Sequence, residues 1–151
     1  MLLEFLQVTM HGLFICDKLP YLAASPDGIV ECDCCVRRVL ELKCPYCLSS
    51  IEKTIEDVPY LQDGHLDQNH DYYYQIQAQM ICTKTKSGDF FVWSPRVEEG
   101  VYLFERISRN LNTCEEILRG SYKFFMQSII PELLAAYHTQ RNNAVNPNNN
   151  V

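Results

Sequence analysis

In the segment Val39–Lys43, the residues from Leu40 onwards alternate between apolar and charged with the two-residue period of a β-strand. Successive side chains of a strand point to opposite faces, so Leu40 and Leu42 share one face. Glu41 and Lys43 share the other. We expect the two leucines to be buried against the core, and the carboxylate and the ammonium to line the opposite face of the sheet.

A second strand is expected just before this one, after the sequence SPDG that contains Asp27. If the chain runs up through Asp27, turns near Asp33 and returns through Glu41, the two strands form a hairpin. Asp27 then lies beside Glu41 and Lys43. The pattern predicts two carboxylates and a lysine that converge at a strand edge.

Helical spacing is clearest in residues 71–83, where we predict a helix capped by Asn69 or Asp71. Three residues share one face of this helix at i, i+3 and i+7 spacing: Tyr72, Gln75 and Gln79. Ile76 and Met80 lie on another face, which is available for packing.

Several further elements are predicted from the same patterns. They are a helix over residues 1–9, a short strand at 13–16, an antiparallel strand pair at 89–95 and 101–107, and a long helix that starts at a capping box in 113–116. Pro131 should either kink this long helix or mark the first turn of a new one. We expect one domain over residues 1–139 and a disordered, asparagine-rich tail over residues 140–151.

A length of 151 residues with 47% hydrophobic residues is sufficient for one domain with a real core. No run of 18 apolar residues is present, and no basic segment leads into an apolar leader. We therefore expect an intracellular protein of the nucleus or cytoplasm that is neither secreted nor membrane-bound. The net charge of −6 weighs against broad coating of DNA, so any contacts to phosphates must be local.

The predicted cluster suits hydrolysis of a phosphodiester bond. Carboxylates such as Asp27 and Glu41 bind Mg²⁺, which prefers oxygen ligands and keeps some of its waters. The main-chain carbonyl of Leu42 is a further candidate ligand. Lys43 can orient or help deprotonate an attacking water. Spacing alone leaves a simpler interpretation open, a half-buried hairpin that carries a surface Glu–Lys pair.

Four segments in order carry a more specific signal: LPYLAASPDGIV, VLELKCPY, YYYQIQAQM and FFVWSP. Together they resemble the phage lambda-type exonuclease and YqaJ-like viral recombinase family of the PD-(D/E)xK nucleases, from about Gly12 to about Leu134. The resemblance implies an α/β (α+β sandwich) fold with a restriction-endonuclease-like mixed sheet flanked by helices. It also implies a magnesium-dependent deoxyribonuclease, with Mn²⁺ able to substitute, which is typically a 5′-to-3′ exonuclease on double-stranded DNA ends used in recombination.

Carried over residue by residue, the resemblance makes Asp27 and Glu41 metal ligands and Lys43 the catalytic lysine. It makes Gln75 the active-site glutamine that supports the lysine and the attacking water. Ser25 and Tyr72 are candidate substrate-binding residues. The family implies two further partners, a single-strand annealing protein and other copies of the chain in a ring.

One departure from the family concerns a further acidic residue on a helix upstream of the aspartate motif. In this alignment that residue falls about two turns before Glu4, roughly 11 Å away along a helix, and so lies ahead of Met1. A fragment, a truncated copy and a degenerate copy all remain open as explanations. The alternative function is a catalytically inactive nuclease fold that binds DNA or a protein.

The eight cysteines allow a third interpretation, a structural zinc or iron–sulfur site. The candidate ligands are Cys32, Cys34, Cys35, Cys44 and Cys47. Against this site, the first three lie at the turn of the predicted hairpin and the last two lie at its opposite end. We expect reduced thiols that pack as small apolar residues.

Overall fold

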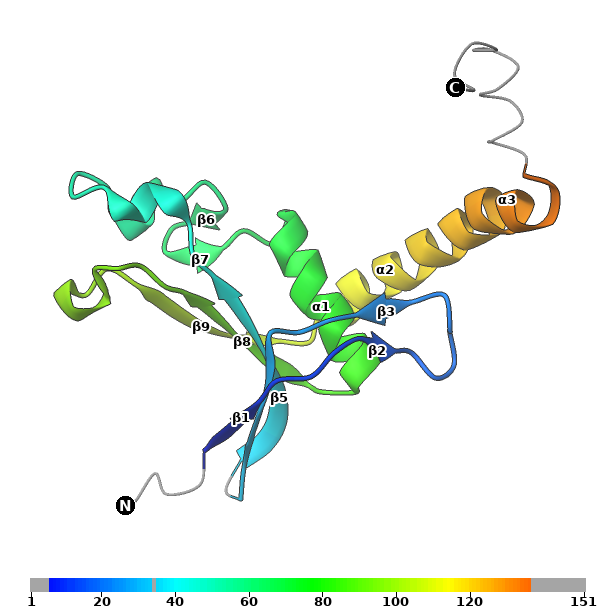
Figure 1. The fold of residues 1–151 in the computed structure, drawn as a ribbon, viewed down its shortest axis with the longest axis horizontal. Helices are drawn as coiled ribbons and strands as arrows, with labels where there is room; N and C mark the ends of the chain where they lie inside the picture. Colours follow the sequence, from blue (N-terminus) through cyan, green and yellow to red (C-terminus); the bar gives the residue numbers. More distant parts are fainter. Residues whose placement is uncertain (1–5, 34, 137–151) are drawn as a thin grey trace, which may run out of the picture. The chain divides into compact units, whose positions relative to one another are not determined.

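The computed structural model describes residues 6–33 and 35–136, and the chain divides into two compact units, Met1–Cys114 and Glu115–Val151. The first unit is built on a five-stranded sheet in the order β1-β4-β5-β8-β9 (Figure 1). Strands β5 and β8 run parallel, and the other neighbouring strands run antiparallel. The strands are β1 Gln7–Thr9, β4 Gly28–Cys32, β5 Cys35–Lys43, β8 Ser87–Val92 and β9 Leu103–Ser108.

Short elements connect these strands. They are the strand pair β2 Phe14–Ile15 and β3 Ala23–Ala24, the pair β6 Leu61–Gln62 and β7 His65–Leu66, and the 3-10 helices η1 Tyr46–Ser49, η2 Ile55–Asp57 and η3 Val97–Glu99. The parallel pairing of β5 with β8 requires a crossover connection, and the helix α1, Asp71–Thr83, lies in that connection.

The predicted hairpin is confirmed as the antiparallel pair β4 and β5, with Gly28 opposite Leu40 and the turn at Asp33. Its last pair is Cys32 opposite Cys35, and these two residues form a disulfide across a Cα–Cα distance of 5.4 Å. The expectation of reduced thiols is therefore wrong for this pair, because the hairpin holds the two side chains face to face.

Helix α1 begins and ends where the spacing predicts it. Its cap differs from the prediction, since His70 Nδ1 accepts a hydrogen bond from the Tyr72 N–H at 3.2 Å, in place of Asn69 or Asp71. The helix packs closely on the sheet at Gly88. A Cβ atom there would lie 2.7 Å from a side-chain carbon of Ile76, so only glycine allows this approach.

The face of the sheet that α1 covers is the face that carries Val39 and Glu41, both fully or almost fully buried. Leu42, on the opposite face, is 41% exposed. The prediction of an alternating strand is confirmed, but the prediction that Leu40 and Leu42 form the buried face is wrong. The Glu41 carboxylate therefore lies on the covered side of the sheet.

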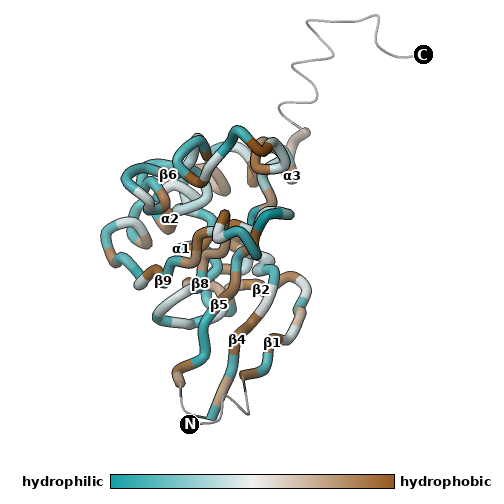
Figure 2. The backbone as a smooth tube through the Cα atoms, turned by 90° about the vertical axis from the view of Figure 1, so that its left-hand side faces the viewer, coloured by the Kyte–Doolittle hydropathy of each residue, from teal (hydrophilic) through white to brown (hydrophobic). Residues whose placement is uncertain are grey.

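The core lies between this covered face and α1, and it continues under the connections that follow β5. In Figure 2 hydrophobic segments of α1, β5 and β8 lie together. The buried apolar residues are Ile29, Val39, Leu48, Val58, Tyr60, Leu66, Tyr73, Ile76, Met80, Phe90, Val92 and Ile107. These residues come from β4, β5, β8, β9, α1 and the connection between β5 and α1, and their packing holds α1 over the sheet.

The N-terminal residues differ from prediction. Gln7–Thr9 is a strand that pairs with Ile29–Glu31 of β4, so a helix over residues 1–9 is wrong for its last part. The rest of that predicted helix, with Glu4, lies outside the described residues, as does the predicted tail at 140–151. Gln7–Thr9 forms a strand and not a helix because the edge of β4 is open to main-chain hydrogen bonds.

The C-terminal helical segment comprises α2 Leu111–Phe124, a π-helical stretch Phe125–Ile129 and α3 Ile130–Ala135. It begins earlier than the predicted capping box, because Asn110 Oδ1 accepts from the N–H groups of Asn112 at 3.0 Å and Thr113 at 3.3 Å. Pro131 lies in the first turn of α3, as one of its two predicted outcomes allows. In the described part of the chain, no helix is both long and apolar enough to span a membrane.

Candidate active site

Asp27 lies just before β4 and is held against the neighbouring strand. Its Oδ2 atom accepts a hydrogen bond from the main-chain N–H of Leu42 at 2.7 Å. The register of the hairpin, Gly28 opposite Leu40, carries Asp27 to this position. The side chain remains exposed, so its second oxygen faces solvent and is available to a ligand.

Glu41 is only 1% exposed, and both of its carboxylate oxygens have partners. Oε1 accepts from Lys43 Nζ, and Oε2 accepts from Gln79 Nε2 at 2.5 Å. A buried carboxylate is very costly unless it is paired and hydrogen-bonded. The lysine and the glutamine supply those interactions on the covered face of the sheet.

Lys43 is held by three side chains at the end of β5. Besides Glu41, its Nζ atom donates to Gln75 Oε1 at 3.2 Å and lies 4.1 Å from the centre of the Tyr72 ring. The Lys43 side chain keeps 17% of its surface exposed, which leaves the ammonium accessible from one side. Three of the predicted residues therefore meet at this lysine, two of them from the first turns of α1.

An aromatic cluster supports the Tyr72 ring. Tyr60 and His70 lie 4.9 and 4.8 Å from it, measured between ring centres, both in edge-to-face geometry. The Tyr60 hydroxyl is buried, has no hydrogen-bond partner among the described residues, and burial raises its pKa. Tyr60 thus acts as a neutral packing residue behind Tyr72.

The structure brings together Asp27, Glu41, Lys43, Gln75 and Tyr72, as the sequence predicts. Ser25 lies two residues before Asp27 and is exposed, with its Oγ atom 3.5 Å from the Gly12 carbonyl oxygen. Gln79 is the residue that the sequence-based assignment lacks. Helical spacing places it on the face of Gln75, but no local pattern indicates its contact with Glu41.

The described candidate cysteines do not form a shared cluster. Cys32 and Cys35 are joined at the tip of the hairpin, whereas Cys44 and Cys47 follow the far end of β5. A nine-residue strand separates these ends by roughly 26 Å at 3.3 Å per residue. No group of three or more His, Cys, Asp or Glu residues able to hold a metal occurs among residues 6–33 and 35–136. Cys34 lies outside the described residues.

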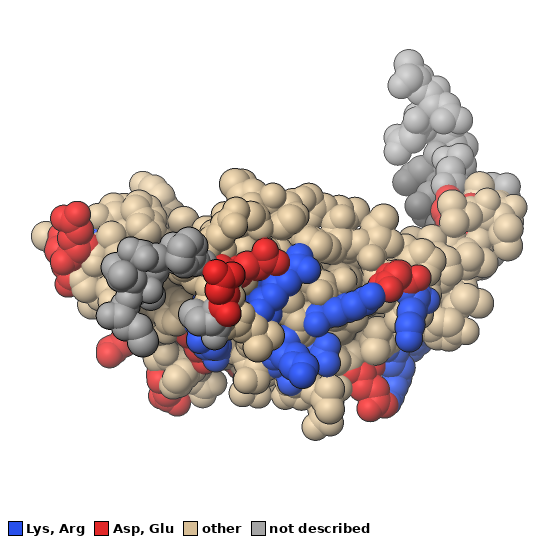
Figure 3. Space-filling view, turned by 90° about the horizontal axis from the view of Figure 1, so that it is seen from below, with Lys and Arg blue, Asp and Glu red and all other residues tan. Residues whose placement is uncertain are grey.

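Several basic side chains lie close together on the face shown in Figure 3, despite the negative net charge. Of the positive residues in the first unit, Arg38 and Arg106 share Asp89, at 2.5 and 2.8 Å. The hydrogen bond that Arg106 donates to the Asp89 carboxylate raises the pKa of Arg106. Lys86 and Arg109 form no ion pair with any described residue.

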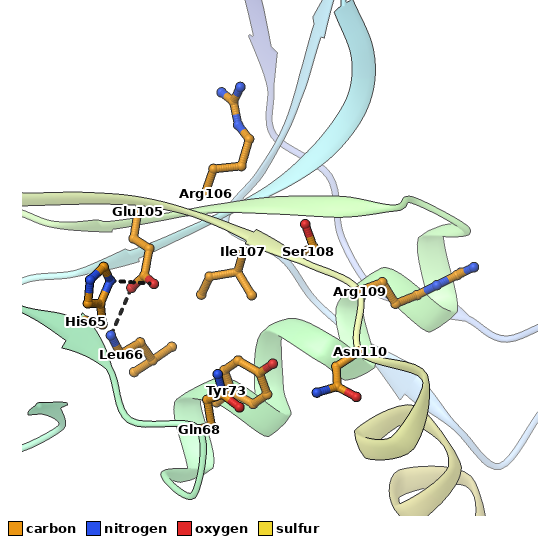
Figure 4. A pocket seen from close by; sticks show the side chains of 10 residues that line it. All are labelled: His65, Leu66, Gln68, Tyr73, Glu105, Arg106, Ile107, Ser108, Arg109 and Asn110. Carbon is orange, nitrogen blue, oxygen red and sulfur yellow. Dashed lines mark hydrogen bonds and ion pairs between the residues drawn. The ribbon is translucent and has the colours of Figure 1, made fainter.

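A pocket of about 630 Å³ lies beside β9, away from the site (Figure 4). Glu105 in this pocket accepts from the Leu66 N–H at 2.8 Å and from His65 Nδ1 at 3.1 Å. The side chains of Arg106 and Arg109 point away from the cavity in Figure 4. None of the predicted site residues lines it, so its polar groups serve to anchor the connection through β7 to the sheet.

Comparison with known proteins places these observations in a family. A profile of the YqaJ-like viral recombinase domain matches residues 5–86. No curated protein sequence matches the chain significantly. The crystal structure of an alkaline exonuclease, LHK-Exo from Laribacter hongkongensis, is similar with a TM-score of 0.64 and 28% identity over 93% of this chain.

The structure of the same exonuclease in complex with dAMP gives a TM-score of 0.65 at the same identity. In both cases the match covers 63% of the exonuclease chain, so this chain spans less than two thirds of its length. The mixed sheet with its flanking helices agrees with the fold of this exonuclease. The predicted restriction-endonuclease-like fold is therefore confirmed.

Proposed function

The chain belongs to the YqaJ-like viral recombinase family, and on this basis we propose that it is a metal-dependent deoxyribonuclease that hydrolyses phosphodiester bonds. The finer proposal is a 5′-to-3′ exonuclease that acts on double-stranded DNA ends during recombination. The observation that carries it is the meeting of Asp27 and Glu41 with Lys43 and Gln75 at the end of β5. The similarity to an exonuclease solved with dAMP supports DNA as the substrate.

The donor set fits a hard divalent cation. Asp27, Glu41 and the main-chain carbonyl of Leu42 offer only oxygen atoms, which Mg²⁺ prefers. Two carboxylates with no thiolate or imidazole disfavour zinc. When bound, Mg²⁺ or a substituting Mn²⁺ supplies Lewis acidity and lowers the pKa of a bound water. Among the described residues, two carboxylates contribute to this set of metal ligands. Oxygen atoms of the substrate and water can fill the remaining coordination positions.

Lys43 provides the positive charge that this reaction needs. Hydrolysis builds negative charge on the phosphoryl oxygens, and an ammonium fixed beside them stabilises that charge more effectively than a mobile one. The contacts to Glu41 and Tyr72 fix the position of Nζ. Lys43 can also donate a hydrogen bond to the attacking water, which orients the water towards phosphorus.

Gln75 has a defined amide orientation because its Oε1 atom accepts from Lys43. The Nε2 hydrogens therefore point away from the lysine and can donate to the attacking water or to a phosphate oxygen. Ser25 and Tyr72 remain the proposed substrate-binding residues. The exposed hydroxyl of Ser25 is next to Pro26 and near Asp27, where it can donate to a phosphate.

The test is time-dependent digestion of 5′-phosphorylated linear duplex DNA, with Mg²⁺ and with a chelator. A closed circular duplex of the same sequence serves as the control for attack at ends. We expect loss of the linear duplex that requires Mg²⁺ and disappears in folded Lys43→Ala and Glu41→Gln variants. Equal digestion by Glu41→Gln, or digestion in excess chelator, would contradict the proposal.

A second candidate function is a catalytically inactive nuclease fold that binds DNA or a protein. It is favoured by the pair of carboxylates, since no third acidic ligand joins them among the described residues. Binding of Mg²⁺ and duplex DNA by a well-folded protein without turnover would support it. Family membership also supports two proposals about partners. Copies of the chain assemble into a ring, and the protein works with a single-strand annealing protein.

A further inference from the structure

Gln79 is fully buried in the third turn of α1, at the junction of the two proposed metal ligands. Its Nε2 atom donates to Glu41 Oε2 at 2.5 Å and lies 3.4 Å from the main-chain oxygen of Ser25. Ser25 is two residues before Asp27. A single amide group therefore joins the strand that carries Glu41 to the segment that carries Asp27.

The orientation of this amide follows from charge. Glu41 presents a carboxylate oxygen and Ser25 a carbonyl oxygen, so the NH₂ group must face them and the amide oxygen must face away. That oxygen, Oε1, is buried without a hydrogen-bond partner among the described residues. An unpaired buried acceptor costs about 1–3 kcal/mol. Packing alone would be served better by an apolar side chain of similar size.

The contact completes the restraint on Glu41. Lys43 holds Oε1 and Gln79 holds Oε2, so the carboxylate cannot rotate. Outer-shell hydrogen bonds of this kind orient metal ligands and alter the affinity for the metal by roughly 10- to 100-fold when they are lost. The unpaired Oε1 atom of Gln79 is a destabilising feature. It is offset if the amide is retained for its effect on Glu41.

We propose that Gln79 is a positioning residue that fixes the Glu41 carboxylate and its place relative to Asp27, and so sets the affinity of the site for its divalent cation. The proposal rests on the proposed function, in which Glu41 and Asp27 bind that cation. Gln79 itself contacts neither substrate nor metal.

A matched control lies two residues away on the same helix. Gln77 is also fully buried, but its Nε2 atom donates to the Ser108 carbonyl at 3.1 Å and its Oε1 atom accepts from the Asn110 N–H at 2.9 Å. These contacts connect α1 with the residues that precede α2 and are separate from the site. Replacing Gln77 therefore tests the loss of a buried glutamine without loss of a contact to Glu41.

The experiment measures Mn²⁺ binding to the folded, metal-free protein by calorimetry and by the electron paramagnetic resonance signal of free Mn²⁺, with no DNA present. Wild type is compared with Gln79→Met, Gln79→Asn and Gln77→Met. We expect about tenfold weaker binding or more in both Gln79 variants. Gln77→Met lowers the melting temperature but keeps Mn²⁺ affinity within about twofold of wild type. Gln79→Asn keeps an amide but moves it away from Glu41. This variant therefore tests the proposal even if Gln79→Met does not fold.

Digestion kinetics give a second readout. Both Gln79 variants should require more metal for half-maximal rate and regain rate as the metal concentration increases, which a purely structural defect would not produce. Wild type that neither binds Mn²⁺ nor digests DNA would overturn the proposed function. Wild type that binds Mn²⁺, with folded Gln79 variants that bind it as tightly, would overturn the role of Gln79 and leave the proposed function intact.

Discussion

The main-chain N–H of Leu42 donates to Asp27 Oδ2 at 2.7 Å, between the two strand residues whose side chains form the buried ion pair of the site. This bond aligns a side chain from the segment before β4 with the end of β5. It uses one oxygen of Asp27 and leaves the other for a cation. Asp27 and Glu41, 14 residues apart in sequence, are thereby held together by the hairpin.

Asp27→Asn separates the structural role of this residue from its charge. The amide oxygen can still accept from Leu42, so we expect the free energy of unfolding to change by less than about 1 kcal/mol. Removal of a ligand charge should lower DNA digestion at least about 100-fold, more than the loss of an outer-shell group. Urea denaturation and digestion of linear duplex DNA measure the two effects. Unchanged digestion by the folded variant would exclude Asp27 as a ligand.

Lys43→Met should destabilise the metal-free protein by about 3 kcal/mol, because Glu41 is almost fully buried and loses its counter-ion. The double variant Glu41→Gln, Lys43→Met removes both charges and should recover most of that loss. Urea denaturation of the wild type, both single variants and the double variant gives the coupling free energy of the pair. Additive effects of the two substitutions would mean that the residues do not interact.

Tyr72→Leu removes the ring that lies 4.1 Å from Lys43 Nζ. A cation–π contact contributes about 0.5–2 kcal/mol, so the digestion rate at saturating DNA should decrease about 2- to 30-fold. Tyr72→Phe retains the ring and is the control. If Tyr72→Phe is as slow as Tyr72→Leu, the hydroxyl and its contact with substrate matter more than the ring.

Gly88→Ala should destabilise the protein by about 1–3 kcal/mol, because the new Cβ atom would lie 2.7 Å from side-chain carbons of Ile76 and Val39. Thermal unfolding measures this effect. Gly120→Ala is the control, since a Cβ placed there meets no described atom within 4 Å beyond its own turn of the helix, and alanine favours a helix. A stable Gly88→Ala variant would mean that α1 does not pack on β8 as closely as described.

Burial raises the pKa of the Cys82 thiol from 9.0 to about 11. The thiol of the unfolded chain therefore loses its proton at a lower pH than that of the folded chain. The free energy of unfolding should keep its full value below pH 9. It should then decrease as the pH increases from 9 to 11. Denaturation with urea across this range measures the slope. Cys82→Ala should reduce this slope, and a slope as steep as that of the wild type would contradict the role of Cys82.

Local sequence determined the individual elements and the identity of the candidate residues. The helix over Asp71–Thr83, the hairpin around Asp33 and the antiparallel strands β8 and β9 follow from periodicity and turn residues, which act between near neighbours in the chain. The order of the four quoted segments pointed to the family and, through it, to Asp27, Glu41, Lys43 and Gln75.

Tertiary structure decided which faces are covered and which distant residues meet. Alternation shows that Glu41 and Leu42 point in opposite directions, but only the packing of α1 shows that the glutamate is the buried one. The edge strand at Gln7–Thr9 depends on an open edge of β4, whose paired residues Ile29–Glu31 lie 20 or more residues further along the chain. The hydrogen bond from Gln79 to Glu41 spans 38 residues. Such contacts depend on how whole elements pack, and a local pattern carries no information about that packing.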